Sequence, residues 1–128
     1  MALNVLVVDD SAVMRKMIIR TLQLTGVPLG EVHEAGDGAE GLAQLDRHWI
    51  DLALVDLNMP VMNGEEMIER MRANSELASV PVVVVSTDGS ETRLARIRPN
   101  VNGFVRKPFT PEQLGEEITR IVGEIGRG

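Results

Sequence analysis

The chain has 128 residues, which fits one domain, and its 44% apolar and 25% charged residues are ordinary for a globular protein. It contains no cysteine, so disulfide bonds and thiolate metal sites are excluded, as expected for a cytoplasmic protein. A net charge of −6 and 2% aromatic residues argue against a nucleic-acid partner, and the lack of a long apolar run argues against a membrane partner.

The first half of the chain alternates strand-like and helix-like segments. Residues 5–8 are apolar and too few for a core helix, which predicts a strand buried on both faces. Residues 32–35 are of mixed polarity and predict an edge strand, and Asp37 and Glu40 mark the start of the helix after it. The helix between these two strands has an apolar stripe at Met14, Met17, Ile18 and Leu22.

The middle of the chain repeats this alternation. Residues 52–55 and 82–85 predict two more buried strands. The spacing of Asn63 and Glu66 predicts the start of the helix between them. Residues 91–98 then form a weaker helix, which Pro99 should end.

The end of the chain completes the pattern with a second edge strand at residues 103–106. Thr110 and Gln113 have the spacing of a capping box, with Pro111 at the first helical position. The helix after it has an apolar stripe at Leu114, Ile118, Ile121, Val122 and Ile125. Five strand–helix repeats predict an α/β fold in which helices cover both faces of a parallel sheet.

Polar residues follow the predicted strands, at the edge where such sheets bind ligands. Asp9 and Asp10 follow the first strand, Asp56 follows residues 52–55, Ser86 ends the next strand, and Lys107 comes after the last. Because the carboxyl ends of parallel strands meet at one edge, we expect these groups to lie together. Each alone would be an ordinary turn, cap or surface residue, and only their joint placement indicates a site.

Three carboxylates at this edge would repel one another, by roughly 4 kcal/mol for a pair about 4 Å apart at an effective dielectric constant of about 20. Without a counter-ion, at least one of them should have a raised pKa. Oxygen ligands without His or Cys favour a hard cation, and Mg2+ typically combines one or two carboxylates with water and a phosphate oxygen. The sequence therefore predicts a Mg2+ site beside a phosphoryl group, with Lys107 as a second positive charge.

Three segments resemble the signature segments of response-regulator receiver domains. They are residues 7–11, 55–60 and 107–109, and Gly64 lies at the expected distance after Pro60. The resemblance covers essentially the whole chain, so residues 1–128 are expected to form a single receiver domain of the CheY-like chemotaxis type. It implies a doubly wound, flavodoxin-like fold with strand order 2-1-3-4-5.

The resemblance also implies roles for the residues at the sheet edge. Asp56 would accept the phosphoryl group, and Lys107 would pair with the phosphoryl oxygens. Asp10, Asp56 and the backbone carbonyl of Asn58 would bind Mg2+, while Asp9 would act through a metal-bound water. The Lys107–Pro108 bond is expected to be cis, a form that only X-Pro bonds adopt readily.

A second set of matched residues would control the response to phosphorylation. Ser86 would move toward the phosphoryl group and Phe104 would rotate, which would switch the surface formed by the fourth helix, the fifth strand and the fifth helix. Asn58, Thr87 and Asp88 would tune dephosphorylation. Because Asn58 and Asp88 are polar, we expect a phosphoryl lifetime of seconds to minutes.

The implied function is two-component signalling. A sensor histidine kinase or a phosphotransfer protein would supply the phosphoryl group, and the chain would dephosphorylate itself with no other enzyme activity. Since the chain ends at Gly128, soon after its fifth helix, output is expected to pass to an unidentified downstream protein, in chemotaxis or in another pathway.

Two departures from the family pattern concern function. Thr87 replaces a smaller Ala or Gly, which would restrict donor access or slow hydrolysis. Residues 98–103 lack the usual Gly-Ala pair before the fifth strand and are about one residue shorter, which changes the expected output surface. His33 and His48 are expected to be isolated, and they have no ligand spacing. Trp49 lies roughly 23 Å along the chain from Asp56, so its fluorescence should report phosphorylation poorly.

Three other functions are compatible with this fold class. A flavin-binding electron carrier would need a phosphate loop rich in Ser, Thr or Gly and aromatic residues around the ring, and the sequence has neither. A phosphatase with an aspartyl intermediate would need an Asp-x-Asp pattern after the first strand, and the sequence lacks this pattern. A receiver that acts without phosphorylation usually loses an acidic residue or the lysine, and all of these are kept here.

Overall fold

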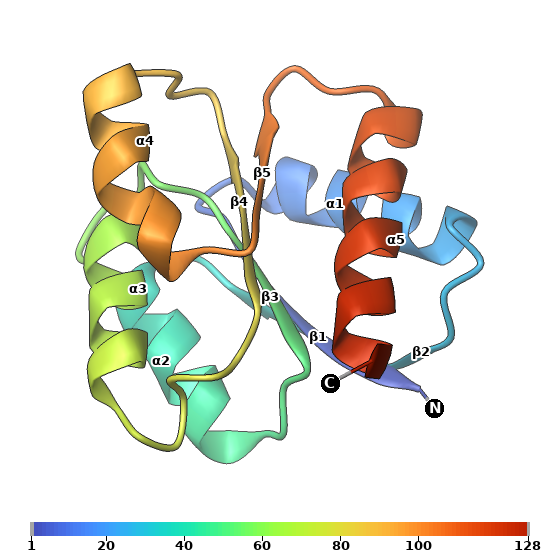
Figure 1. Ribbon diagram of the computed structural model, residues 1–128, viewed down its shortest axis with the longest axis horizontal. Helices are drawn as coiled ribbons and strands as arrows, with labels where there is room; N and C mark the ends of the chain where they lie inside the picture. The colour runs from blue at the N-terminus through green and yellow to red at the C-terminus, as the bar shows by residue number, and fades with distance from the viewer. Residues whose placement is uncertain (1, 128) are drawn as a thin grey trace.

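The computed structural model describes the backbone of residues 2–127 and the side chains of residues 2–124. A parallel five-stranded sheet forms its centre, with the strand order β2-β1-β3-β4-β5, which confirms the predicted doubly wound topology (Figure 1). The strands are β1 (Leu3–Val8), β2 (Leu29–Ala35), β3 (Leu52–Val55), β4 (Val82–Ser86) and β5 (Gly103–Arg106).

Helices cover both faces of this sheet (Figure 1). On one face lie α1 (Ala12–Leu24) and α5 (Pro111–Arg127). On the other lie α2 (Gly38–Arg47), α3 (Gly64–Ala73) and α4 (Glu91–Ile97), and a single 3-10 turn at Arg98–Asn100 follows α4. None of the helices in the described part of the chain has the length and hydropathy of a membrane span.

The helix starts follow the capping signals in the sequence. The side chains of Asp37 and Asn63 accept hydrogen bonds from the backbone N–H groups three residues later, which satisfies donors that a helix leaves unpaired. At α5 the capping box is reciprocal, because the Thr110 Oγ1 accepts from the Gln113 N–H at 3.1 Å and the Gln113 Oε1 accepts from the Thr110 N–H at 2.9 Å. Local sequence thus fixes where the helices begin and so which loops reach the sheet edge.

Two apolar layers form the core, one on each face of the sheet. Every residue of β3 and β4 is buried, which explains why these strands read as uninterrupted apolar runs. Their side chains alternate between the layers: Leu54 packs with α1 and α5, and Val55 packs with α2 and α3. The strands β2 and β5 lie at the two sheet edges, as their mixed polarity predicted.

Two helix details differ from the predictions, and a third cannot be compared. Met17 is 49% exposed, and Thr21 takes the buried position in α1, because a turn of 3.6 residues aligns Thr21, rather than Met17, with Met14 and Ile18. Helix α4 ends at Ile97, one residue early, because Pro99 belongs to the tighter turn that follows. The predicted stripe residue Ile125 and the chain end at Gly128 lie outside the described side chains.

Candidate functional site

The site lies where the strand order reverses, at the carboxyl ends of β1 and β3. Strand β2 pairs with one edge of β1, and strand β3 pairs with the other edge. The connections at this point therefore run in opposite directions, and a crevice forms at the carboxyl ends of the strands. The backbone N–H of Asp9 donates to the Ala35 carbonyl at 3.0 Å, and that of Asp56 donates to the Val8 carbonyl at 2.9 Å. Sheet pairing therefore fixes both acidic residues at their backbones.

The three carboxylates predicted to converge do so. Asp9, Asp10 and Asp56 each present a carboxylate oxygen, and these atoms all lie within 4.8 Å of one another. Asp9 and Asp56 are 1% and 7% exposed, whereas Asp10 is exposed to solvent. The arrangement places a concentrated negative charge where little water can screen it.

Lys107 supplies the one ammonium group in contact with these acids among the described residues. Its Nζ lies 2.6 Å from the Asp9 Oδ2 and 3.4 Å from the Asp56 Oδ2, and its side chain is 10% exposed. The backbone N–H of Lys107 continues the sheet by donating to the Ser86 carbonyl, and the Lys107–Pro108 bond is cis, as expected. We call Asp9, Asp10, Asp56 and Lys107 the acidic rim.

The acidic rim is only partly neutralised. Burial raises the pKa of Asp56, Lys107 opposes that rise, and the neighbouring Asp9 adds to it; hydrogen bonds from the Ser86 side chain and the Asn58 backbone lower it. Three carboxylates face one ammonium, so a divalent cation would compensate the remaining charge. An all-oxygen set of this kind suits a hard cation such as Mg2+.

The two oxygens of Asp9 are already engaged. Oδ2 contacts Lys107, and Oδ1 accepts a hydrogen bond from the Ser11 N–H at 2.8 Å. Asp10, unlike Asp9, is exposed to solvent. This difference agrees with an indirect role for Asp9 and a direct one for Asp10 in binding a cation.

The predicted switch residues occupy two different places. Ser86 is fully buried at the end of β4, and its Oγ accepts a hydrogen bond from the Asp88 N–H at 3.2 Å. Thr87 is exposed. Phe104 is half-buried in β5, where it packs with the apolar layer under α2, α3 and α4 and lines a pocket with Leu94 and Ile97 of α4, away from the acidic rim.

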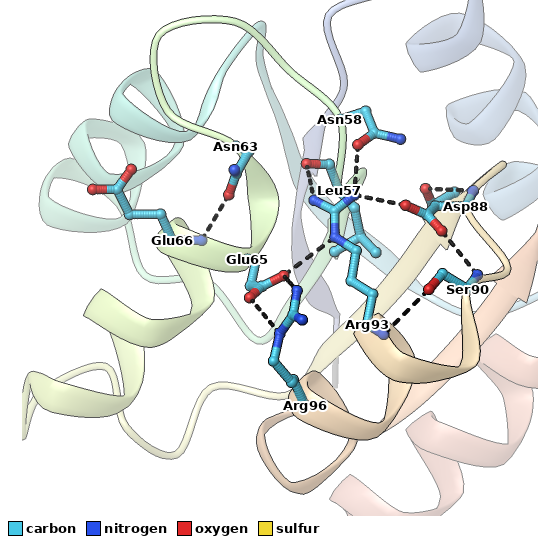
Figure 2. Close-up of polar contacts among 10 residues, drawn as sticks. Leu57, Asn58, Asn63, Glu65, Glu66, Asp88, Ser90, Arg93 and Arg96 are labelled. Carbon is cyan, nitrogen blue, oxygen red and sulfur yellow. Dashed lines mark hydrogen bonds and ion pairs between the residues drawn. The ribbon is translucent and has the colours of Figure 1, made fainter.

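A group of charged side chains beside the rim was not predicted from the sequence (Figure 2). The Arg93 Nη1 donates to the Asn58 Oδ1 and to the Asp88 Oδ2, both at 2.7 Å, and its Nε donates to the Glu65 Oε1 at 3.2 Å. Arg96 also contacts Glu65 at 3.2 Å. We call Glu65, Asp88, Arg93 and Arg96 the arginine cluster.

The charges of the arginine cluster are balanced. Hydrogen bonds from Arg96 lower the pKa of Glu65, and those from Arg93 lower it further. The Ser90 backbone N–H lowers the pKa of Asp88 most, followed by Arg93. No local pattern signals these contacts, because Arg93 and Asn58 are 35 residues apart and meet only in the folded chain.

Gly64 connects α3 to the acceptor strand. A Cβ at this position would lie 2.1 Å from the Asp56 carbonyl oxygen, and the Gly64 N–H donates to the Leu57 carbonyl at 3.0 Å. Glycine is therefore required here by the close approach of two backbones. The contact holds the first turn of α3 against the peptide that carries Asp56.

The expectation that the histidines are isolated is wrong. The rings of His33 and His48 stack with centroids 3.7 Å apart, and the His33 Nε2 lies 2.8 Å from the Glu31 Oε1. Strand β2 and the end of α2 bring them together on the same side of the sheet, which spacing along the chain does not reveal. Glu31, His33 and His48 each offer one possible metal-ligand atom, and these atoms all lie within 4.8 Å of one another.

Comparisons with known proteins agree with this geometry. The family described as "Response regulator receiver domain" matches residues 5–119. Chemotaxis protein CheY1 of Helicobacter pylori is 34% identical over 94% of this chain and 98% of its own length, and a CheY homolog of Campylobacter jejuni is 34% identical over 94% and 93%. The structure of chemotaxis protein CheY4 of Vibrio cholerae is 34% identical, covers 94% of this chain and 99% of its own, and superposes with a TM-score of 0.84.

The sheet order, the family match and these relatives all point the same way. The chain belongs to the response regulator receiver domain family of two-component signalling.

Proposed function

We propose that this receiver accepts a phosphoryl group on Asp56 and uses it to control a partner protein. The observation that carries the proposal is the partly neutralised acidic rim, in which three converging carboxylates face one ammonium. Such a site favours a divalent cation together with a phosphoryl group whose oxygens share that cation and Lys107. Residues 1–128 would act as one receiver domain, which the family match over residues 5–119 supports.

Mg2+ would be held by Asp10, Asp56 and the backbone carbonyl of Asn58, with Asp9 acting through water. The engagement of both Asp9 oxygens by Lys107 and Ser11 supports this division of roles. When bound, Mg2+ would offset the charge of the carboxylates and of the transferring phosphoryl oxygens.

In the transfer step, an Asp56 carboxylate oxygen forms a bond to phosphorus while the bond from phosphorus to the donor breaks. With a phosphohistidine donor, the imidazole leaves as the neutral ring. Lys107 remains an ammonium throughout and balances charge on the phosphoryl oxygens from its position beside Asp56. A sensor histidine kinase or a phosphotransfer protein would be the donor.

The output would arise from the new charge at Asp56. A phosphoryl group adds about −1.5 to −2 charges and three acceptor oxygens, which would attract the Ser86 hydroxyl. The space that Ser86 leaves and the pocket beside Phe104 would allow that ring to rotate inward and change the face formed by α4, β5 and α5. The chemotaxis names of the relatives favour a partner in chemotaxis.

The phosphoryl group would be lost by hydrolysis within seconds to minutes. Asn58, Thr87 and Asp88 flank the acceptor and would tune the access of water. The Asn58 and Thr87 side chains are exposed, and the Asp88 carboxylate is held by Arg93, so these side chains border the acceptor on its solvent side. A lifetime of many hours in the presence of Mg2+ would contradict this expectation.

Intact-mass measurement after incubation with acetyl phosphate and Mg2+ tests the proposal. The wild-type chain should gain the mass of one phosphoryl group, and both Asp56→Asn and a wild-type sample without divalent cation should not. If the folded wild-type chain gains no phosphoryl group, the result would favour the alternative function, an interaction module that acts without phosphorylation.

A further inference from the structure

Two series of contacts, which we call arms, lead from the loops beside Asp56 to the Arg93 guanidinium. The first arm starts at Asn58, two residues after Asp56 in the loop that follows β3. The Asn58 side chain extends outward, and its Oδ1 accepts a hydrogen bond from the Arg93 Nη1 at 2.7 Å. Arg93 thus contacts the loop that begins at the acceptor.

The second arm starts on β4. The Ser86 Oγ accepts a hydrogen bond from the Asp88 N–H at 3.2 Å. The Asp88 Oδ2 accepts from the same Arg93 Nη1 at 2.7 Å. One guanidinium nitrogen therefore joins the two arms and bridges the β3–α3 loop, which carries Asn58, to the β4–α4 loop, which carries Asp88.

Arg93 is well suited to maintain this bridge between the two loops. Its Nε is fixed by Glu65 of α3 at 3.2 Å, its Nη2 donates to the Leu57 carbonyl at 3.3 Å, and its side chain is only 17% exposed. Figure 2 shows the guanidinium between Asn58 and Asp88, with Glu65 on its other side. A planar group with several donors in fixed directions can satisfy four partners at once, which a lysine cannot.

We propose that Arg93 is a positioning residue for phosphoryl chemistry at Asp56, because its bridge between Asn58 and Asp88 closes the side of the acceptor site that lies between the β3–α3 and β4–α4 loops. The inference deepens the proposed function and rests on it. Arg93 acts through Asn58 and Asp88, the two side chains that flank the acceptor, and it belongs to α4, the helix of the proposed output face.

The step affected is hydrolysis of the acyl phosphate. The oxygen of a water molecule forms a bond to phosphorus, and the bond between phosphorus and the Asp56 oxygen breaks, which returns the carboxylate and releases dihydrogen phosphate. The water must approach in line with the breaking bond. With the bridge closed, Asn58 and Asp88 are occupied by Arg93 and cannot orient that water.

Removing the bridge should therefore shorten the phosphoryl lifetime. We expect Arg93→Ala to lose its phosphoryl group about threefold to tenfold faster than wild type, the effect of losing roughly one hydrogen bond's net contribution. Arg93→Lys keeps the charge but reaches fewer partners, so its phosphoryl lifetime should lie between those of wild type and Arg93→Ala. The readout is the decay of the phosphorylated mass after acetyl phosphate is removed, with Mg2+ present.

Arg96→Ala is the matched control. Arg96 lies one turn further along α4 and contacts Glu65, like Arg93, but contacts neither Asn58 nor Asp88. Its phosphoryl decay should equal that of wild type. In an Asn58→Ala background, which lacks one end of the bridge, Arg93→Ala should change the decay less than it does in wild type, an effect that a general loosening of α4 would not produce.

Each outcome decides the inference. Equal decay in wild type and Arg93→Ala, slower decay in Arg93→Ala, or equally faster decay in Arg96→Ala would overturn it. If Arg93→Ala does not fold, Arg93→Lys decides in its place: it should lose its phosphoryl group faster than wild type, and equal or slower decay would overturn the inference. A wild-type chain that gains no phosphoryl mass would instead refute the proposed function.

Discussion

The acidic rim and the arginine cluster lie side by side at one end of the sheet, yet their charges are arranged differently. In the acidic rim, three carboxylates converge, Lys107 contacts two of them, Asp9 and Asp56, and burial raises the pKa of Asp56. In the arginine cluster, two carboxylates meet two guanidinium groups, and the pKa values of both acids are lowered. The comparison shows that the acidic rim carries uncompensated negative charge, whereas the arginine cluster is locally neutral.

The largest change in stability is expected when the ammonium group of Lys107 is removed from the acidic rim. Lys107→Ala leaves the Asp9 carboxylate buried without its partner at 2.6 Å, and breaking a buried pair typically costs about 3–5 kcal/mol. We expect a loss of unfolding free energy of that order in urea titrations without divalent cation, and a partial recovery with Mg2+. Lys16→Ala is the control, because the Lys16 side chain is 74% exposed and should contribute less than about 1 kcal/mol.

Asp56→Asn should act in the opposite direction. Because burial raises the pKa of Asp56 in the folded state, its ionisation opposes folding, and the stability present below the unfolded-state pKa is lost as the pH rises through the folded-state value. At pH 7 without Mg2+, the amide should therefore give a higher urea midpoint than wild type. With Mg2+ the difference should shrink, because the ion binds the folded wild type. A lower midpoint for the amide without Mg2+ would show that the rim is already neutralised.

A smaller effect is expected when Glu65 of the arginine cluster is neutralised. The pKa of Glu65 is lowered from its ordinary 4.5 by Arg96 and Arg93, so its contribution to stability is present above the unfolded-state pKa and is lost as the pH falls through the folded-state value. Glu65→Gln should be destabilised by about 1 kcal/mol or less at pH 7, and the difference from wild type should shrink as the pH falls below the unfolded-state pKa of Glu65.

Glu66→Gln provides the neighbouring control for this measurement. Among the described residues, the Glu66 carboxylate contacts only the exposed Arg70 of the same helix, and the Glu66 side chain is 46% exposed. Its urea midpoint should change less than that of Glu65→Gln at pH 7. Equal changes for the two variants would mean that the contacts between α3 and α4 add nothing to stability.

The smallest expected effect concerns Trp49. Its side chain is 78% exposed in the loop before β3, at the end of the sheet opposite the acidic rim, and its Nε1 donates to the Asp51 side chain. Fluorescence emission should therefore stay unchanged when acetyl phosphate and Mg2+ phosphorylate the chain. A clear change in emission would mean that phosphorylation alters the whole sheet.

The sequence predicted those parts of the molecule that depend on local signals. Capping residues and short apolar runs located the helices and strands, and the position of each acidic residue after a strand located the acidic rim. The arginine cluster was missed because the contacts of Arg93 depend on how α4 packs against α3. The same holds for His33 and His48, which are 15 positions apart in the sequence but stack across two elements.

The close contact at Gly64 separates two kinds of evolutionary constraint. A side chain there would collide with the backbone of Asp56, so any other residue would force two backbone segments apart. Asp10, by contrast, is exposed and serves no such packing need. If Asp10 serves the proposed phosphoryl chemistry, a homologue that has lost that chemistry should vary at the aspartate and still keep the glycine.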